Sequence, residues 1–372
     1  MNDIKIMYLI GNGFDIGTLS RYGDGVTSSY SHFYNYFKYK NPSSEDNEII
    51  KAMEIARDAN KENWSDIEGI IGTFFEDGYS SSETVSKLTA DLSEVQLLFS
   101  KFLNELVTDD VLAEVSAVCF KNKVARDAFK NFLKDLSNNQ YSKLKFPARV
   151  VNHDLIDFNI INFNYTALLD NYLYLDRSQF DPMPYSYSNN NFNVILDPNS
   201  YGHRGTNYEY EDPFVRIKAN IYHPHGYQDI PKSLLFGSED NNKKISNNDN
   251  RKFFIKSICA QDEDKYSSII NETKLFIVYG CSLGSSDSWW WHKILVEVAK
   301  QEDNAELIIY YYDDGRNSLN EEEIKDLFIS NAICTCDADD EELESDMDLI
   351  KERIFVVKHG PCGGEVSFMQ YE

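Results

Sequence analysis

The stretch IKIMYLIGNGFD, residues 4–15, decides the fold class. Residues 4–10 form a mainly apolar run of strand length, and this run passes directly into the turn Gly11-Asn12-Gly13. A short apolar run bounded by a glycine turn is typical of a buried strand, and open α/β sheets bind ligands beyond the carboxyl ends of such strands. We therefore predict a buried strand over 4–10 and a ligand-facing loop after it.

Strand patterns return in the second half of the chain and alternate with helical ones. Apolar runs occur at 158–163, 217–222, 275–279, 307–312 and 354–357, and helical patterns occupy 166–175 and 288–300. Strands that alternate with helices indicate a mostly parallel sheet covered on both faces. The fold class that follows is a Rossmann-like α/β sheet.

A helical block separates the first strand from the others. Apolar residues recur at helical spacing in 64–74, 88–106 and 129–136, which predicts three amphipathic helices. We therefore divide the chain into a first strand–loop–helix unit at 1–44, a helical insertion at 45–150, and the remainder of the α/β core at 151–372. This last part contains a turn-rich excursion at 176–213.

The charge balance bears on partners. The 372 residues include 36 Lys and Arg against 61 Asp and Glu, which gives a formal net charge of −25. Since nucleic-acid affinity comes largely from basic side chains that neutralise phosphates, nucleic acid is not an expected partner. The acidic run 337–348 is most simply a solvated surface, and the alternative is a docking site for a basic partner.

The sequence predicts neither a membrane-spanning segment nor disulfide bonds. The apolar runs are too short for a signal peptide or a bilayer span, so we expect a cytoplasmic protein without membrane contact. The six cysteines include no CxxC pair. In a reducing compartment they are expected to be free thiols, and no structural zinc site is expected.

Two motifs bring backbone groups to the predicted carboxyl edge of the sheet. In Gly11-Asn12-Gly13-Phe14-Asp15, glycines permit close approach and the helix start offers N–H groups to a phosphate; a plain tight turn is the alternative. In Gly280-Cys281-Ser282-Leu283, followed by Asp287, the glycine admits a ligand and the serine hydroxyl suits a ribose or phosphate oxygen.

Two further motifs supply side chains for chemistry. NFNYT at 162–166 offers the amide of Asn164, which otherwise would be a helix N-cap. HPHG at 223–226 offers His225, since histidine accepts a proton near neutral pH, although a structural histidine is the simpler alternative. Because all four motifs follow predicted strands, we expect Gly11, Asn164, His225 and Gly280 to surround one cleft.

The order of these motifs resembles that of the bacteriophage abortive-infection AbiH family. LIGNGFD at 9–15, WSDIE at 64–68, NFNYT, HPHG and GCSLGSSD at 280–287 occur in the family's order over nearly the whole chain. The resemblance implies a role in bacterial defence, in which an infected cell is arrested or killed. A phage-derived trigger is an expected partner.

A more distant resemblance is to sirtuin-like NAD-binding domains. It implies that Asn164 is the catalytic amide, that His225 is the catalytic histidine, and that Gly280 and Ser282 form part of the shelf for NAD. Asp15 departs from the pattern, since sirtuins have a small hydroxyl or apolar residue there, and Thr166 stands where defence NADases often have Asp. The two Cys pairs of the deacetylase zinc module are missing, so lysine deacetylation is not expected.

Together the resemblances predict an abortive-infection effector that hydrolyses NAD, as its substrate, at the nicotinamide–ribose bond. Asn164 would orient a water or a ribose hydroxyl, and His225 would accept its proton. The nucleotide would be bound by residues 11–15 together with Gly280, Ser282 and Asp287. No metal is expected in this mechanism.

Three alternatives stay open. The same pocket would serve a non-catalytic nucleotide sensor, and an effector that acts on nucleic acid is the second alternative. The third is a metallohydrolase in which His223 and His225, on one face of a strand, hold zinc with Asp15 or Asp287. Homo-oligomerisation is left open.

Overall fold

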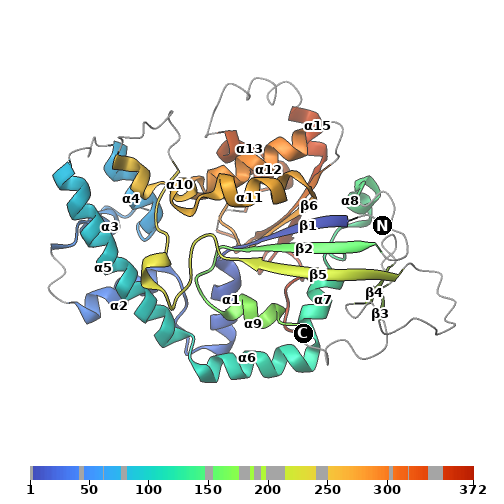
Figure 1. Cartoon of the computed structure of the whole chain (residues 1–372), viewed down its shortest axis with the longest axis horizontal. Coiled ribbons are helices and arrows are strands. Elements are labelled where there is room, and N and C mark those ends of the chain that lie inside the picture. Colours follow the sequence, from blue (N-terminus) through green and yellow to red (C-terminus); the bar gives the residue numbers. More distant parts are fainter. Residues whose placement is uncertain are drawn as a thin grey trace.

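The fold is an eight-stranded sheet between helices, with a further layer of helices to one side (Figure 1). The computed structural model describes residues 3–41, 46–61, 63–76, 82–146, 154–175, 185–187, 194–197, 214–239, 250–300, 305–316, 318–333 and 347–372. The strands are β1 (Asp3–Ile10), β2 (Leu155–Asn162), β3 (Tyr185–Tyr187), β4 (Val194–Asp197), β5 (Phe214–Tyr222), β6 (Thr273–Tyr279), β7 (Glu306–Tyr312) and β8 (Ile354–His359). Their order across the sheet is β3-β4-β5-β2-β1-β6-β7-β8.

The sheet is mostly parallel, as predicted. Within it only β3 and β4 pair antiparallel, and the other neighbours run parallel. If the strands from β5 to β8 are numbered as they occur in the chain, their order reads 3-2-1-4-5-6, which is the Rossmann order. The chain extends outward through β2 to β5 and then returns to the other side of β1, so the topological switch point lies between β1 and β6.

Both faces of the sheet are buried, because successive side chains of a strand point to opposite faces. In β1, Ile6 and Tyr8 face one core, and Met7 and Leu9 face the other. The first core is covered by α1 (Gly13–Tyr22), α6 (Asp109–Asn122), α7 (Val124–Lys130) and α9 (Leu168–Leu173). The second is covered by α11 (Asp262–Asn271), α12 (Ser288–Ala299), α13 (Glu321–Ile333) and α15 (Met347–Glu352).

A third core holds together what we call the helical layer, formed by α2 (Tyr30–Lys40), α3 (Glu48–Asp58), α4 (Ile67–Glu76) and α5 (Ser82–Leu106). Aromatic rings dominate it: Phe33 lies 4.8 Å from Phe99 between ring centroids, and Phe99 lies 5.2 Å from Phe236. The layer includes α2, which precedes residue 45, whereas α6 and α7 pack on the sheet. The division of the chain at residues 44 and 150 stays a prediction.

One predicted helix is shorter than expected. The pattern at 129–136 predicts a helix, but α7 ends at Lys130 and Phe132, Leu133 and Leu136 lie in the turns that follow, all buried. The same spacing of apolar residues fits a series of turns, because turns also direct these side chains toward the core. Most of the excursion at 176–213 and the acidic residues 337–346 lie outside the described residues, as do two of the six cysteines, Cys334 and Cys336.

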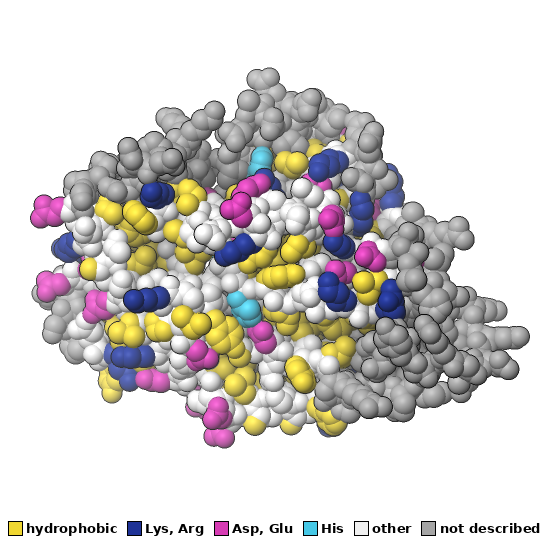
Figure 2. Space-filling model, viewed as in Figure 1, with side chains coloured by type: hydrophobic (Ala, Val, Ile, Leu, Met, Phe, Trp, Pro, Cys, Tyr) yellow, Lys and Arg dark blue, Asp and Glu magenta, His cyan; other side chains and the backbone are white. Residues whose placement is uncertain are grey.

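The described part of the face in Figure 2 carries no broad basic patch, in keeping with the net charge of −25. On the face in Figure 2, the described Lys and Arg side chains are interspersed with Asp and Glu and do not gather into one broad patch. None of the described helices is long and apolar enough to cross a bilayer. Four cysteines in the described ranges, namely Cys119, Cys259, Cys281 and Cys362, are free thiols.

Candidate functional site

The loops that follow β1, β2, β5 and β6 meet at the carboxyl edge of the sheet, because these four strands are neighbours. The Gly13 N–H donates to the Gly280 carbonyl oxygen at 2.8 Å, and the Asn164 amide nitrogen lies 3.4 Å from the Ile10 carbonyl oxygen. The His225 ring stacks on Phe163 at 4.7 Å between centroids. The predicted adjacency of the four strands is confirmed, and their loops contact one another.

Glycines let two of these loops pack backbone against backbone. A Cβ on Gly11 would lie 2.6 Å from the Gly280 oxygen, and Gly280 itself has φ +69°, a conformation that favours glycine. The Gly11 N–H donates to the Tyr279 oxygen at 2.9 Å, and the Phe14 N–H to the Gly11 oxygen at 3.1 Å. The amides predicted to receive phosphate therefore already bond backbone carbonyls, and the phosphate-binding role of these glycines stays a prediction.

Three other residues predicted to bind nucleotide have different surroundings. The side chain of Asn12 is held by Ser28, whose hydroxyl donates to Asn12 Oδ1 at 2.6 Å. Phe14 is buried and packs edge-on against Tyr172 at 5.2 Å. Ser282 is exposed, and its hydroxyl accepts from the Gly284 N–H at 3.4 Å. Of the three, Ser282 is the residue that solvent reaches best.

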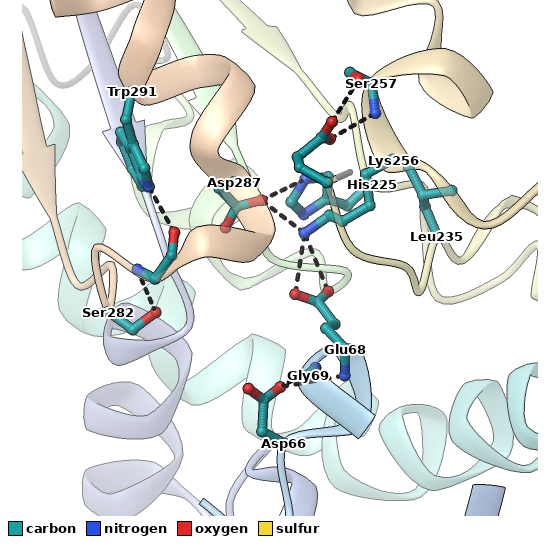
Figure 3. A network of polar contacts seen from close by, with 12 residues as sticks. Asp66, Glu68, Gly69, His225, Leu235, Lys256, Ser257, Ser282, Asp287 and Trp291 are labelled. Carbon is teal, nitrogen blue, oxygen red and sulfur yellow. Dashed lines mark hydrogen bonds and ion pairs between the residues drawn. The ribbon is translucent and has the colours of Figure 1, made fainter. Parts of the chain in front are cut away.

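A largely buried group of polar side chains, which we call the lysine cluster, consists of Glu68, His225, Lys256 and Asp287 (Figure 3). Lys256, on α10 (Lys256–Ala260), is 2% exposed. Its Nζ lies 2.6 Å from Asp287 Oδ1 and 3.1 Å from each oxygen of Glu68. His225 Nε2 lies 3.4 Å from the same Asp287 oxygen. Because Glu68 is on α4, the cluster joins the helical layer to the loops of the sheet.

Burial sets the charges of this cluster. It lowers the pKa of His225 to about 3, so the imidazole stays neutral near pH 7. Burial alone would raise the pKa of Asp287, but the charge of Lys256 lowers it below its ordinary value. Burial raises the pKa of Glu68 in spite of Lys256. A general base works best with a pKa near the working pH, so His225 is a weak proton acceptor here.

A second group of polar side chains, separate from the lysine cluster, begins at Asn164. Asn164 Nδ2 donates to Asn162 Oδ1 at 2.9 Å, and Asn162 Nδ2 lies 3.4 Å from Asp170 Oδ2. The other oxygen of Asp170 lies 3.0 Å from His223 Nε2. We call this chain of four residues the relay. Asn164 is not a helix N-cap, since α9 begins at Leu168.

Three buried polar atoms near the relay have no hydrogen-bond partner among the described residues: Asp15 Oδ1, Asn164 Oδ1 and His223 Nδ1. The other Asp15 oxygen accepts from the Thr166 hydroxyl at 2.7 Å. Asp15 is 1% exposed, and burial raises its pKa to about 7. Since buried polar groups are nearly always paired, such atoms mark a place where a ligand or water fits.

The zinc alternative required His223 and His225 to converge on one ion. The strand β5 ends at Tyr222, so the spacing of side chains on a strand does not apply to them. His223 faces Asp170 and His225 faces Asp287. Within the described ranges, no three His, Cys, Asp or Glu side chains are grouped so as to hold a metal.

Some residues of this site stand in recognisable sequence motifs, and others do not. Asn164 and His225 stand in short motifs at strand ends, and Glu68 stands in WSDIE, but Lys256 follows no motif and sequence reasoning missed it. Asp170 was also missed, although it lies six residues after Asn164 on the predicted helix. A buried lysine is found only by knowing which residues surround it.

The strand order and the four loops define a Rossmann-type α/β protein with helices packed beside the carboxyl edge of its sheet. The model of the family described as "Bacteriophage abortive infection AbiH" matches residues 7–311. The chain belongs to this family, which implies a role in abortive infection by phage. No curated protein matches the chain.

Proposed function

We propose that this AbiH-family protein limits phage infection by hydrolysing NAD in the infected cell. The observation that carries the proposal is the meeting of four loops at the switch point of a sheet with Rossmann strand order, which is where such sheets bind dinucleotides. The unpartnered amide oxygen of Asn164 at this edge adds a group able to hold a water or a ribose hydroxyl. Loss of NAD arrests metabolism, which fits the family's role.

The proposed reaction consumes one water. Its oxygen forms a bond to C1′ of the nicotinamide ribose, while the bond from C1′ to the nicotinamide nitrogen breaks and its electron pair stays on that nitrogen. A base accepts the proton of the water, and the products are ADP-ribose and nicotinamide. Asn164 orients the water. Asp170 favours the positive charge that develops on the ribose, since a charge placed in advance stabilises a transition state.

Substitution of Asn164 tests the proposal. We expect Asn164→Ala to abolish nicotinamide release and protection against phage, because the amide that orients the nucleophile is gone. NAD and nicotinamide are measured in infected cells and with purified protein, and protection is measured as efficiency of plating. Asn139→Ala, at an exposed position on α8 (Asn138–Lys143), is the matched control. Full protection and unchanged NAD loss by Asn164→Ala would refute the proposal.

A second candidate function is nucleotide sensing without turnover. It is favoured by one observation, namely that burial lowers the pKa of His225 to about 3, which leaves the predicted catalytic histidine a weak proton acceptor. Titration calorimetry with NAD, combined with product analysis, separates the two functions. A sensor binds NAD and leaves it intact with and without infected-cell extract.

A further inference from the structure

Two histidines lie two residues apart in the HPHG motif, and they belong to different groups. His225 is in the lysine cluster, 5% exposed at its side chain, with its Nε2 beside Asp287. His223 is 20% exposed at its side chain, and its partner Asp170 is 35% exposed. The side chains of His223 and Asp170 are thus nearer to solvent than that of His225.

The relay connects His223, and not His225, to the side chain of Asn164. The contacts run from Asn164 to Asn162 at 2.9 Å, from Asn162 to Asp170 at 3.4 Å and from Asp170 to His223 at 3.0 Å. Both ends of this chain carry a buried atom without a hydrogen-bond partner in the described structure, Asn164 Oδ1 and His223 Nδ1. The open oxygen of Asn164 suits a bound water, and the open ring nitrogen of His223 suits the base that deprotonates it.

We propose that His223, oriented by Asp170, is the general base of this protein's reaction and acts together with Asn164. The inference rests on the proposed hydrolysis of NAD, and it replaces His225 as the base. Asp170 is a positioning residue, because it acts through His223.

The contacts give each atom of the pair a role. His223 Nε2–H donates to Asp170 Oδ1, which fixes the tautomer and leaves the lone pair of Nδ1 free to accept the proton of the water. Asp170 then stabilises the imidazolium, and Asn162 holds its second oxygen. Two other titratable groups lie near His223. The carboxyl group of Asp15 interacts electrostatically with His223, and the ring of Tyr227 lies edge-on to the imidazole at 5.2 Å between centroids.

Four variants test the pair in the full-length protein with NAD as the probe. We expect His223→Gln to lower kcat by about 10²–10⁴-fold, the usual contribution of a general base, with KM changed only a few-fold. Asp170→Asn should lower kcat and leave KM in place, and Asp170→Glu should restore part of the loss. Added imidazole should restore turnover to His223→Gly, which a merely structural histidine would not permit. His292→Gln on α12 and the exposed Asp229→Asn are the matched controls.

Phage protection by the same variants separates this inference from the proposed function. If the wild-type protein leaves NAD intact even in infected cells, the proposed function fails, and the pair is then judged by efficiency of plating alone. Loss of protection in folded His223→Gln and Asp170→Asn, with partial return in Asp170→Glu, supports the pair in either case. Wild-type kcat or full protection in His223→Gln, together with loss in folded His225→Gln, overturns it. Thermal melting establishes that each variant is folded.

Discussion

At the scale of single residues, burial decides what a side chain can do. His223 and His225 come from one motif, yet the second is enclosed against Phe163 and has a pKa of about 3, while the first faces Asp170 at the edge of the protein. The motif HPHG predicts a histidine at this edge. It does not predict which of the two is enclosed, because that depends on the loops after β2 and β6.

Asp15 gives a prediction about pH. Burial raises its pKa from 3.8 to about 7 in the folded protein, so between these values the folded state holds a proton that the unfolded state has lost. The contribution of Asp15 to stability is therefore complete below about pH 4, falls as the pH rises and levels off above about pH 7. Asp15→Asn removes this loss, and we expect it to be more stable than wild type at pH 8 by about 2–4 kcal/mol.

Urea unfolding at pH 4.5 and pH 8 measures this effect. The difference between wild type and Asp15→Asn isolates the one carboxyl group, since the other buried carboxyls titrate equally in both proteins. A difference that does not change with pH would mean that Asp15 is ionised throughout.

At the scale of elements, the junction between β1 and β6 depends on two loops that only glycine allows. Gly280 has φ +69°, and a Cβ there would lie 2.9 Å from the Phe14 nitrogen and 3.0 Å from the Gly11 oxygen. We expect Gly280→Ala to lower the free energy of unfolding by about 1–3 kcal/mol, because neither backbone can move away easily. Gly17→Ala on α1 is the matched control.

The control should change stability in the opposite direction. A Cβ at Gly17 meets nothing within 4 Å, and replacing a helical glycine by alanine stabilises by about 0.5–1 kcal/mol. Denaturant unfolding of both variants measures the pair. Equal effects of the two substitutions would contradict the packing role given to Gly280.

Elements differ in how far the sequence predicts them. The apolar runs that became β1, β2 and β6 were predicted because burial on both faces requires continuous apolar residues. The four strands that precede the motifs were predicted to lie together, but their order across the sheet was not, since a run such as 275–279 carries no mark of its partner. The contact of Lys256 with Glu68 was missed for the same reason, because the two residues are 188 positions apart in the chain.

At the scale of the whole molecule, the lysine cluster fastens the helical layer to the sheet. Lys256→Met leaves Glu68 buried, and Asp287 largely buried, without their counter-ion, and breaking a buried ion pair in this way typically costs about 3–5 kcal/mol. We expect this loss at pH 8 and a smaller one at pH 5, where a proton on Glu68 relieves the repulsion. Lys232→Met, at an exposed position, should change stability by less than about 0.5 kcal/mol.

Hydrogen exchange shows which part of the protein loses stability in Lys256→Met. Amides of α4 and α5 should exchange faster in Lys256→Met, whereas those of β1 and β2 should keep their protection until global unfolding. Uniform acceleration across the chain would show instead that the layer and the sheet unfold as one unit.

The pairing of β1 has a consequence for how this protein is made. Asp3 pairs with Leu155 and Ile6 with Leu275, so one neighbour of β1 is synthesised about 270 residues later in the chain. At about 5–20 residues per second, the ribosome takes roughly 15–50 seconds to supply it. During that time an apolar strand edge stays open on the nascent chain, so we expect the yield of active protein to depend on chaperone supply.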